Sequence, residues 1–365
     1  MISESMPQLV LRRAQFSRLT VSGFLAVFVA LMFLTGCVIS PRRPVPGSGS
    51  PTPTPTPGAA TGQLYVSNDS ASAILRFGGA LTANGTATPT VIKGLATKLN
   101  SPQYLFLDAA TDTLYVANSG TSSILVFANA STMTGAPAPS REIIASNAAF
   151  TSPSDIALDK TRNLLYVVDG FDIFSFANAS TINGVVSPAQ DMILTFAPQA
   201  IFVDGANNRL YAANAAGSQI AIFDAASTLT ANVAPTRTVS GTSLNAPSGV
   251  LVDSSGRLVV ANAGVTGPSI TIFSGAATAN GTPTPVATIT GANTTLNTPN
   301  QIVLNTAATG GDLYVADPTA GSIDVFTNLA TANANLAPAR RLTGTGVTQS
   351  SAAPTARGIA LDTSR

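Results

Sequence analysis

A segment of about 50 residues recurs six times in this chain, and this repeat limits the possible folds more than any other feature. Each copy has a motif like that of residues 114–118 (LYVAN), then an apolar run that ends in phenylalanine. A proline follows each phenylalanine by 12 residues. The motifs centre on Tyr65, Tyr115, Tyr166, Tyr211, Val259 and Tyr314, the phenylalanines are Phe77, Phe127, Phe176, Phe223, Phe273 and Phe326, and the prolines are Pro89, Pro139, Pro188, Pro235, Pro285 and Pro338. One spacing kept in six copies indicates one structural unit used six times.

Each copy contains four short segments with strand character, which are β-branched or aromatic and bounded by turn residues. In the second copy they cover residues 104–108, 114–117, 124–127 and 141–144. Four strands in about 50 residues predict one blade, and the chain as a whole is predicted to be an all-β, six-bladed β-propeller with four antiparallel strands per blade. The first two strands are apolar at nearly every position, as suits strands covered on both faces. The fourth carries proline and often arginine, which predicts a protected edge at the rim.

The two ends of the repeat region complement each other. The first copy begins at residues 63–66 and lacks a first strand, whereas the chain ends in a first strand at residues 358–362. We expect the C-terminal strand (about 356–362) to pair with the N-terminal blade (about 63–93) and to close the ring. The propeller is thus predicted to occupy residues 62–365.

Residues 1–36 are typical of an export signal. Arg12, Arg13 and Arg18 precede a 15-residue apolar run, whereas a membrane span needs about 20 residues. The run ends in LTGC at residues 34–37, which resembles the lipobox of bacterial lipoproteins.

The lipobox resemblance implies lipidation of Cys37, the only cysteine, by acyl chains such as palmitate. The alternative is an ordinary signal peptide followed by a free cysteine. Residues 37–61, rich in proline and threonine, predict an extended stalk. We expect a cell-envelope protein held by its lipid anchor. By resemblance to enterobacterial sorting, Val38 favours the outer membrane if the source is Gram-negative.

The composition excludes several kinds of chemistry. The chain has no histidine, and so it lacks a Ser-His-Asp triad and histidine metal ligands. Its 18 basic and 17 acidic residues nearly balance, and no basic patch points to nucleic acid as a partner. We expect no cofactor and a monomeric state. A Ca²⁺ site made of aspartate and asparagine oxygens is left open.

Loop lengths distinguish two faces of the predicted ring. Connections from first to second strand and from third to fourth strand keep nearly constant lengths, and we call their side the uniform face. The other connections vary: the second-to-third spacing is 12 residues in four copies, but 10 between residues 166 and 176 and 14 between residues 259 and 273. We call this side the variable face. Loops on a rigid scaffold commonly carry function, so we expect the ligand here.

The candidate ligand-binding residues lie where the variable face is expected to meet the central opening. Some precede a first strand and differ from copy to copy, and others are the Asn or Asp that ends each second strand. Solvated loop residues and turn formers, respectively, are the simpler interpretations of these two groups. The candidates are Asp155, Asp169, Arg357, Tyr104, Gln301 and Asp317, and a bound metal would use Asp155, Asp169 and Asn118. The Asp series that ends the first strands and the Asn-Gly pairs at 84–85, 183–184 and 280–281 are predicted to be structural.

The motifs at residues 114–118 (LYVAN) and 313–317 (LYVAD) resemble the second strands of NHL-type and YVTN-type propeller repeats. Residues 152–159 (SPSDIALD) are similar to the first strand of an NHL repeat. The resemblance covers residues 62–365 and implies the fold. Some related propellers are lactonases, and the gluconolactonase-like ones use a glutamate with Asn and Asp around a divalent cation. No glutamate of this chain falls near the expected opening.

These features predict a membrane-tethered, extracytoplasmic propeller that binds or scaffolds a protein or glycan through its variable face, rather than an enzyme. The alternative is a divalent-metal-dependent hydrolase of lactonase type that uses Asp and Asn oxygens at the central opening. A third interpretation is a structural envelope protein without a specific ligand.

Overall fold

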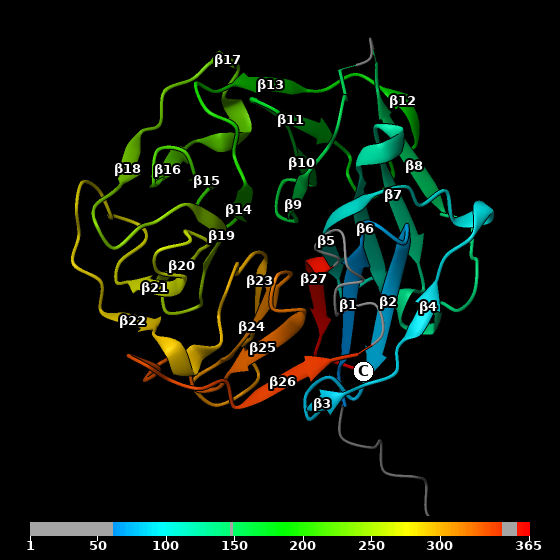
Figure 1. Ribbon diagram of the computed structural model, residues 1–365. Helices are drawn as coiled ribbons and strands as arrows, with labels where there is room; N and C mark the ends of the chain where they lie inside the picture. The colour runs from blue at the N-terminus through cyan, green and yellow to red at the C-terminus, as the bar shows by residue number, and fades with distance from the viewer. Residues whose placement is uncertain (1–60, 147–148, 345–355) are drawn as a thin grey trace, which may run out of the picture. The chain divides into compact units, whose positions relative to one another are not determined.

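The computed structural model describes residues 61–146, 149–344 and 356–365. The predicted signal peptide, Cys37 and the Pro/Thr-rich stalk lie outside these residues. Six small sheets stand side by side in a ring (Figure 1). The described chain is a six-bladed β-propeller. No helix within the described ranges is long and apolar enough to cross a membrane.

The blades follow chain order, and neighbouring strands within each blade run antiparallel. Blade I contains β1 (Gln63–Asn68), β2 (Ala73–Gly78) and β4 (Thr90–Ile92), blade II contains β5 (Pro102–Asp108), β6 (Thr113–Asn118), β7 (Ser123–Ala128) and β8 (Arg141–Ala145), and blade III contains β9 (Asp155–Asp159), β10 (Leu164–Asp169), β11 (Asp172–Ala177) and β13 (Gln190–Ile193). Blade IV contains β14 (Ala200–Asp204), β15 (Arg209–Asn214), β16 (Gln219–Asp224) and β18 (Arg237–Val239), blade V contains β19 (Pro247–Val252), β20 (Leu258–Asn262), β21 (Ser269–Phe273) and β22 (Ala287–Thr290), and blade VI contains β23 (Ile302–Asn305), β24 (Asp312–Asp317), β25 (Ser322–Phe326) and β26 (Arg340–Thr343).

The ring is closed by the C-terminal strand, as predicted. Strand β27 (Ala356–Asp362) lies innermost in blade I and pairs antiparallel with β1, and Figure 1 shows the red strand beside the blue one. The register places Tyr65 opposite Ala360 and Val66 opposite Ile359. Beyond the strand, the amide of Gly62 donates to the carbonyl oxygen of Arg365 at 2.7 Å. Both ends of the described chain therefore build one sheet.

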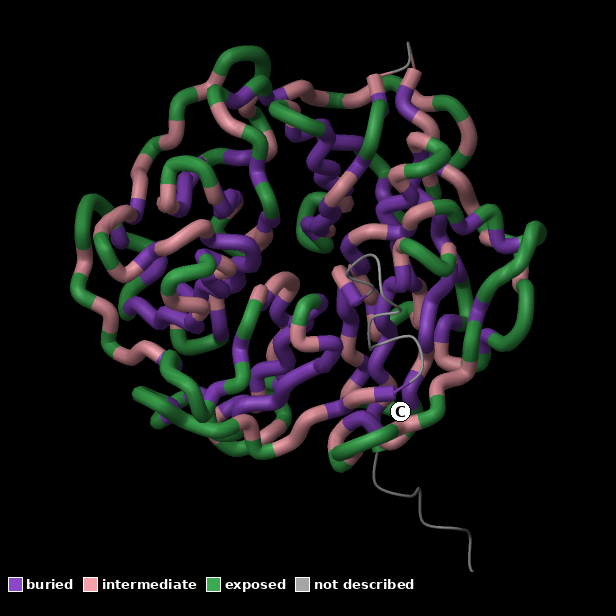
Figure 2. Tube along the Cα trace, in the orientation of Figure 1, coloured by how far each residue is buried: buried purple, intermediate pink, exposed green. Residues whose placement is uncertain are grey.

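The hydrophobic core lies between neighbouring blades, which Figure 2 shows as purple inner strands under a green and pink exterior. In the cluster between blades II and III, Tyr115 and Phe176 pack together with residues of both sheets. The phenylalanine that ends each third strand is at most 1% exposed in all six blades. Inner strands are apolar throughout because each sheet is covered on both faces.

The rim differs from the sequence prediction, in which each fourth strand was an unpaired edge protected by proline and arginine. The segment between the third and fourth strands of each blade pairs in parallel with the fourth strand of the preceding blade. These pairs are β3 (Gly85–Thr86) with β26, β12 (Gly184–Val186) with β8, β17 (Ala231–Asn232) with β13, and single bridges from Gly135 to Ile92, Gly281 to Val239 and Ala334 to Ile289. Three sheets therefore have five strands, and the fourth strands are not free edges.

The Asn-Gly pairs, expected to be local turns, make these rim contacts. The Oδ1 atom of Asn84 accepts the backbone N–H of Arg341 at 2.9 Å, and that of Asn183 accepts the N–H of Glu142 at the same distance. The glycine after Asn84 has φ +74°, a conformation that favours glycine. The structural role predicted for these pairs includes a link between neighbouring blades.

Candidate functional site

In blades II, III, V and VI, the Asn or Asp that ends the second strand anchors the loop that leads into the first strand of the same blade. In blade III, Oδ1 of Asp169 accepts the side-chain O–H of Thr151 at 2.6 Å, and both carboxylate oxygens accept the N–H of Ser152. Asp169 is 4% exposed. Its carboxylate therefore fixes the backbone of a variable-face loop.

Asn118 and Asp317 occupy the same place in blades II and VI. Oδ1 of Asn118 accepts the N–H of Asn100 at 2.7 Å, and its amide donates to the carbonyl oxygen of Lys98. Asp317 accepts the N–H groups of Asn297 and Thr298 at 2.6 and 3.0 Å. Both side chains are buried. These side chains are therefore more than local turn formers, because each binds a loop about 20 residues earlier in the chain.

Arg357 stands apart from these anchors. Its Nε donates to Oδ2 of Asp69 at 3.0 Å, and 41% of its side chain is exposed. The pair links the start of β27 to the loop after β1 in blade I. Arg357 is therefore a surface residue of the variable face with a partner in its own blade.

Tyr104 crosses the ring at the variable-face end of β5. Its hydroxyl donates to the carbonyl oxygen of Ser248 at 3.0 Å and also contacts Oδ1 of Asn300. Ser248 belongs to blade V, which lies opposite blade II in a six-membered ring. The Tyr104 side chain is 6% exposed, and burial raises the pKa of its hydroxyl. Tyr104 thus closes the centre of the ring at this face, where the sequence predicted an opening.

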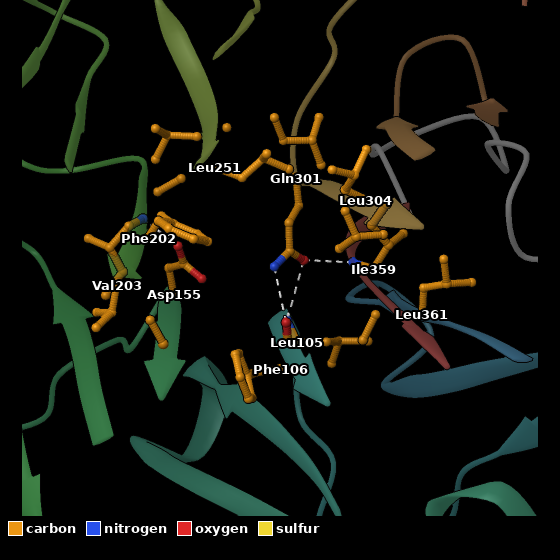
Figure 3. A pocket seen from close by; sticks show the side chains of 18 of the residues that line it. Leu105, Phe106, Asp155, Phe202, Val203, Leu251, Gln301, Leu304, Ile359 and Leu361 are labelled. Atoms are coloured by element: carbon orange, nitrogen blue, oxygen red, sulfur yellow. Dashed lines mark hydrogen bonds between the residues drawn. The ribbon is translucent and has the colours of Figure 1, made fainter. Parts of the chain in front are cut away.

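Gln301 makes a second link across the centre. Its amide nitrogen donates to the carbonyl oxygen of Leu105 at 3.0 Å, and its Oε1 accepts the N–H of Ile359 at 2.7 Å. Figure 3 shows this side chain reaching from blade VI toward β5 and β27. Gln301 therefore joins the inner strands of blades I, II and VI.

Asp155, at the start of β9, also lies near the centre of the ring. The residue is buried, with 2% of its surface exposed. Its Oδ1 accepts the N–H of Ile156 and its Oδ2 accepts the N–H of Ile201, both at 2.7 Å. No ion pair joins Asp155 to a cationic side chain of the described residues. Burial, which outweighs these two hydrogen bonds, raises the pKa of Asp155 to about 8.

Below Tyr104 a cavity of about 320 Å³ runs between the six inner strands. Its lining is mainly aliphatic, with Asp155 and Gln301 among the few polar side chains (Figure 3). One half-exposed aliphatic residue from each inner strand forms a ring near the uniform face, and we call these six the aliphatic ring: Leu107, Leu158, Val203, Val252, Leu304 and Leu361. The sequence reasoning missed this ring, although each member directly precedes the Asp or Asn that ends a first strand.

The candidates are therefore divided between two places. Tyr104, Gln301 and Asp155 meet around the centre, whereas Asp169, Asp317 and Asn118 each hold a different loop. No three acidic, histidine or cysteine residues within residues 61–146, 149–344 and 356–365 gather as a metal site would require. Asp155, Asp169 and Asn118 each already bind backbone N–H groups of separate segments.

The variable face also carries exposed apolar side chains that the sequence analysis did not select. Leu95, in the connection from β4 to β5, is 101% exposed, and Val265, between β20 and β21, is 91% exposed. Phe171, between β10 and β11, is 56% exposed. A signal was present in the sequence for Phe171 and Val265, because each is the only large apolar residue in a short connection that contains glycine.

Comparison with known proteins supports the fold. No protein-family model and no curated protein matches this chain. The chain is similar to a structure of a nidogen/laminin complex, with 16% identity and a TM-score of 0.52 over 82% of this chain and 97% of that chain. It also matches hydrazine synthase of Kuenenia stuttgartiensis, with 14% identity and a TM-score of 0.45 over 62% of this chain and only 58% of that chain. Identities this low concern the fold alone.

Proposed function

We propose that this protein is a membrane-tethered, extracytoplasmic β-propeller lipoprotein that binds a partner protein through its variable face. The observation that carries the proposal is the set of three exposed apolar side chains, Leu95, Phe171 and Val265, on loops of unequal length. Variable loops on a rigid scaffold commonly carry binding residues, and a few apolar or aromatic anchors supply much of the energy of protein interfaces.

The loops that present these side chains are held in place before any partner arrives. The amide of Leu194 donates to the carbonyl oxygen of Phe171 at 2.9 Å, which ties that turn to the end of β13. The amides of Ala263 and Gly264, in the loop that presents Val265, donate to the carbonyl oxygens of Ala246 and Asn245, both at 3.0 Å. A loop already fixed in one conformation loses less entropy on binding, so these anchors favour affinity.

The likeness to the nidogen/laminin structure is compatible with this proposal, since that structure is of a complex between nidogen and laminin. A glycan is the other ligand class suggested by the sequence. The exposed tips are aliphatic or phenyl groups without hydrogen-bonding atoms, and this favours a protein over a sugar. The NHL-type and YVTN-type resemblance of the repeats agrees with a binding role.

The localisation in this proposal is inferred from the sequence. The LTGC motif at residues 34–37 supports lipidation of Cys37, and the stalk would hold the propeller away from the bilayer. In cells that express the full chain, Cys37→Ala should move the protein from the membrane fraction to the soluble extracytoplasmic fraction. Retention of this variant in the membrane fraction would show that Cys37 is not the anchor.

The binding proposal is tested with a photo-activated cross-linking amino acid placed at residue 171 or 265 of the full chain in its native cell envelope. We expect both positions to give an adduct with the same protein. Val185, on the rim, is 70% exposed and serves as the control position. Adducts at residue 185 that match those at 171, or no adduct at either variable-face position, would contradict a partner at this face.

Two multiple variants then distinguish a specific role of the exposed apolar side chains on the variable face from a general effect of apolar side chains on the surface. With the cross-linking amino acid kept at residue 265, Leu95→Ser and Phe171→Ser are combined in one chain, and Val91→Ser, Val185→Ser and Val286→Ser in another. The second set lies on the rim at 41%, 70% and 54% exposure. Only the first chain should lose the adduct, and both should keep the melting temperature of the unmodified protein, because no replaced side chain is buried.

A further inference from the structure

The central cavity is large enough to hold a small molecule. Its volume of about 320 Å³ exceeds the ~150 Å³ of an engineered apolar cavity that accepts benzene, and it reaches the lower end of the ~300–1,000 Å³ of small-molecule sites. All six inner strands contribute to its wall. Propeller blades generally surround a central channel, and here the aliphatic lining leaves part of that channel unfilled.

The cavity is closed at one end and accessible at the other. At the variable face, Tyr104 and Gln301 span the centre with hydrogen bonds to opposite and neighbouring blades. At the uniform face, the exposed residues Ser254 and Thr306 lie on its lining, and the aliphatic ring around it is half-exposed. A ligand would therefore enter through the aliphatic ring.

Asp155 sits toward the closed end and faces the cavity beside Phe202 (Figure 3). Its carboxylate receives two backbone N–H bonds, and each oxygen retains a lone pair. A buried carboxyl group either stays neutral or is charged and paired with a cation, and no described side chain supplies that cation here. A bound ligand that carries a cation with a hydrogen to donate would pair with the charged form.

We propose that the central cavity binds a linear primary amine. The ammonium group of the amine lies against the carboxylate of Asp155, and its alkyl chain lies within the aliphatic ring. At ~30 Å³ per non-hydrogen atom, the cavity holds a ligand of about ten such atoms. The aliphatic wall excludes polar molecules such as sugars, and the carboxylate disfavours fatty acids of the same length. This inference is independent of the variable-face function, because it uses the other end of the ring.

The test compares three probes of equal length on the purified full chain by isothermal titration calorimetry below their micelle concentrations: n-octylamine, 1-octanol and octanoate. We expect n-octylamine to bind one per chain and at least about tenfold more tightly than 1-octanol, since a charge-assisted hydrogen bond adds to the shared apolar contact. Octanoate should not bind. Equal affinities for amine and alcohol in the unmodified protein would overturn the assignment of Asp155, even if no variant folds.

Two variants locate the site. Asp155→Asn should lower the affinity for n-octylamine to that for 1-octanol, while leaving 1-octanol binding within about threefold. Val252→Phe narrows the aliphatic ring and should abolish binding of both probes. Unchanged octylamine affinity in Val252→Phe, with an unchanged far-ultraviolet circular dichroism spectrum, would place the amine on the surface and contradict the proposal.

Discussion

The hydroxyl of Tyr104 lies 3.0 Å from the carbonyl oxygen of Ser248, although the two residues are 144 positions apart in sequence and belong to opposite blades. Together with the Gln301 contacts, this contact closes the centre of the ring at the variable face. The two faces of the ring therefore have different properties. The variable face presents anchored loops with apolar tips, and the uniform face gives access to the channel.

Removing the Tyr104 hydroxyl should destabilise the ring. In Tyr104→Phe the carbonyl group of Ser248 loses a buried donor, and we expect the free energy of unfolding to fall by about 1–3 kcal/mol in urea denaturation. Tyr166→Phe is the matched control, because the buried hydroxyl of Tyr166 has no hydrogen-bond partner in the described structure. That variant should be as stable as the unmodified protein or slightly more stable. Equal losses in both variants would contradict a specific role for the Tyr104 contact.

The raised pKa of Asp155 predicts a pH dependence of stability. The pKa is about 8 in the folded protein and near 3.8 in the unfolded chain, so the folded state binds more protons between these values. The free energy of unfolding should therefore fall as the pH rises from about 4 to about 8. Asp155→Asn removes this contribution, although it costs about 1–3 kcal/mol at low pH because one backbone N–H loses its acceptor. The stability deficit of the variant should shrink with rising pH, and a constant deficit from pH 4 to 8 would refute the assignment.

Asp324 is a second buried carboxylate, and its position is occupied by leucine in blades I and II (Leu75 and Leu125). Its side chain is fully buried, 3.4 Å from Nε of Arg341, and burial raises its pKa to about 7. Asp324→Leu should therefore raise the free energy of unfolding at pH 8 by about 1–3 kcal/mol. The gain should be smaller at pH 5, where the folded protein already carries a neutral carboxyl group. Thermal unfolding at both pH values measures the difference, and destabilisation at pH 8 would show that the pair with Arg341 outweighs the desolvation of both groups.

The rim contacts should contribute individually to stability. Asn183→Ala removes the acceptor for the N–H of Glu142, and we expect a loss of about 0.5–1.5 kcal/mol in urea denaturation. Asn293→Ala is the control, since the exposed side chain of Asn293 makes no hydrogen bond to the described residues. A loss of the same size in both variants would mean that the Asn183 contact adds nothing.

The fold could be predicted in detail because its pattern is local and repeated. Six phenylalanines followed at one spacing by proline identify the blades, and the unpaired first strand at residues 358–362 identifies the closure. The rim contacts could not be predicted, because a parallel pair such as Gly85 with Leu342 joins residues at the two ends of the repeat region. Nothing in a turn sequence shows that its asparagine binds the preceding blade.

The candidate site could be predicted only in part, again because some of its contacts join distant parts of the chain. Residues such as Asp169 and Asp317 recur in every blade, and their recurrence correctly suggested a structural alternative for them. Tyr104 and Gln301 were selected because they differ from their counterparts in the other blades. Their contacts across the ring depend on which blades lie opposite each other, and that is a property of the closed ring rather than of any one repeat.

Every assignment of a face or a channel wall depends on β27 pairing with β1, so the exchange of these amides with deuterium tests the account most directly. Hydrogen–deuterium exchange of the full chain should show that the amides of Ile359 and Ala360 are as strongly protected as those in the centre of β6, although they lie near the C-terminus. Chain ends that are not held in a sheet exchange rapidly. Complete exchange of residues 356–362 at the rate of an unstructured peptide, while β6 remains protected, would contradict the closed six-bladed ring.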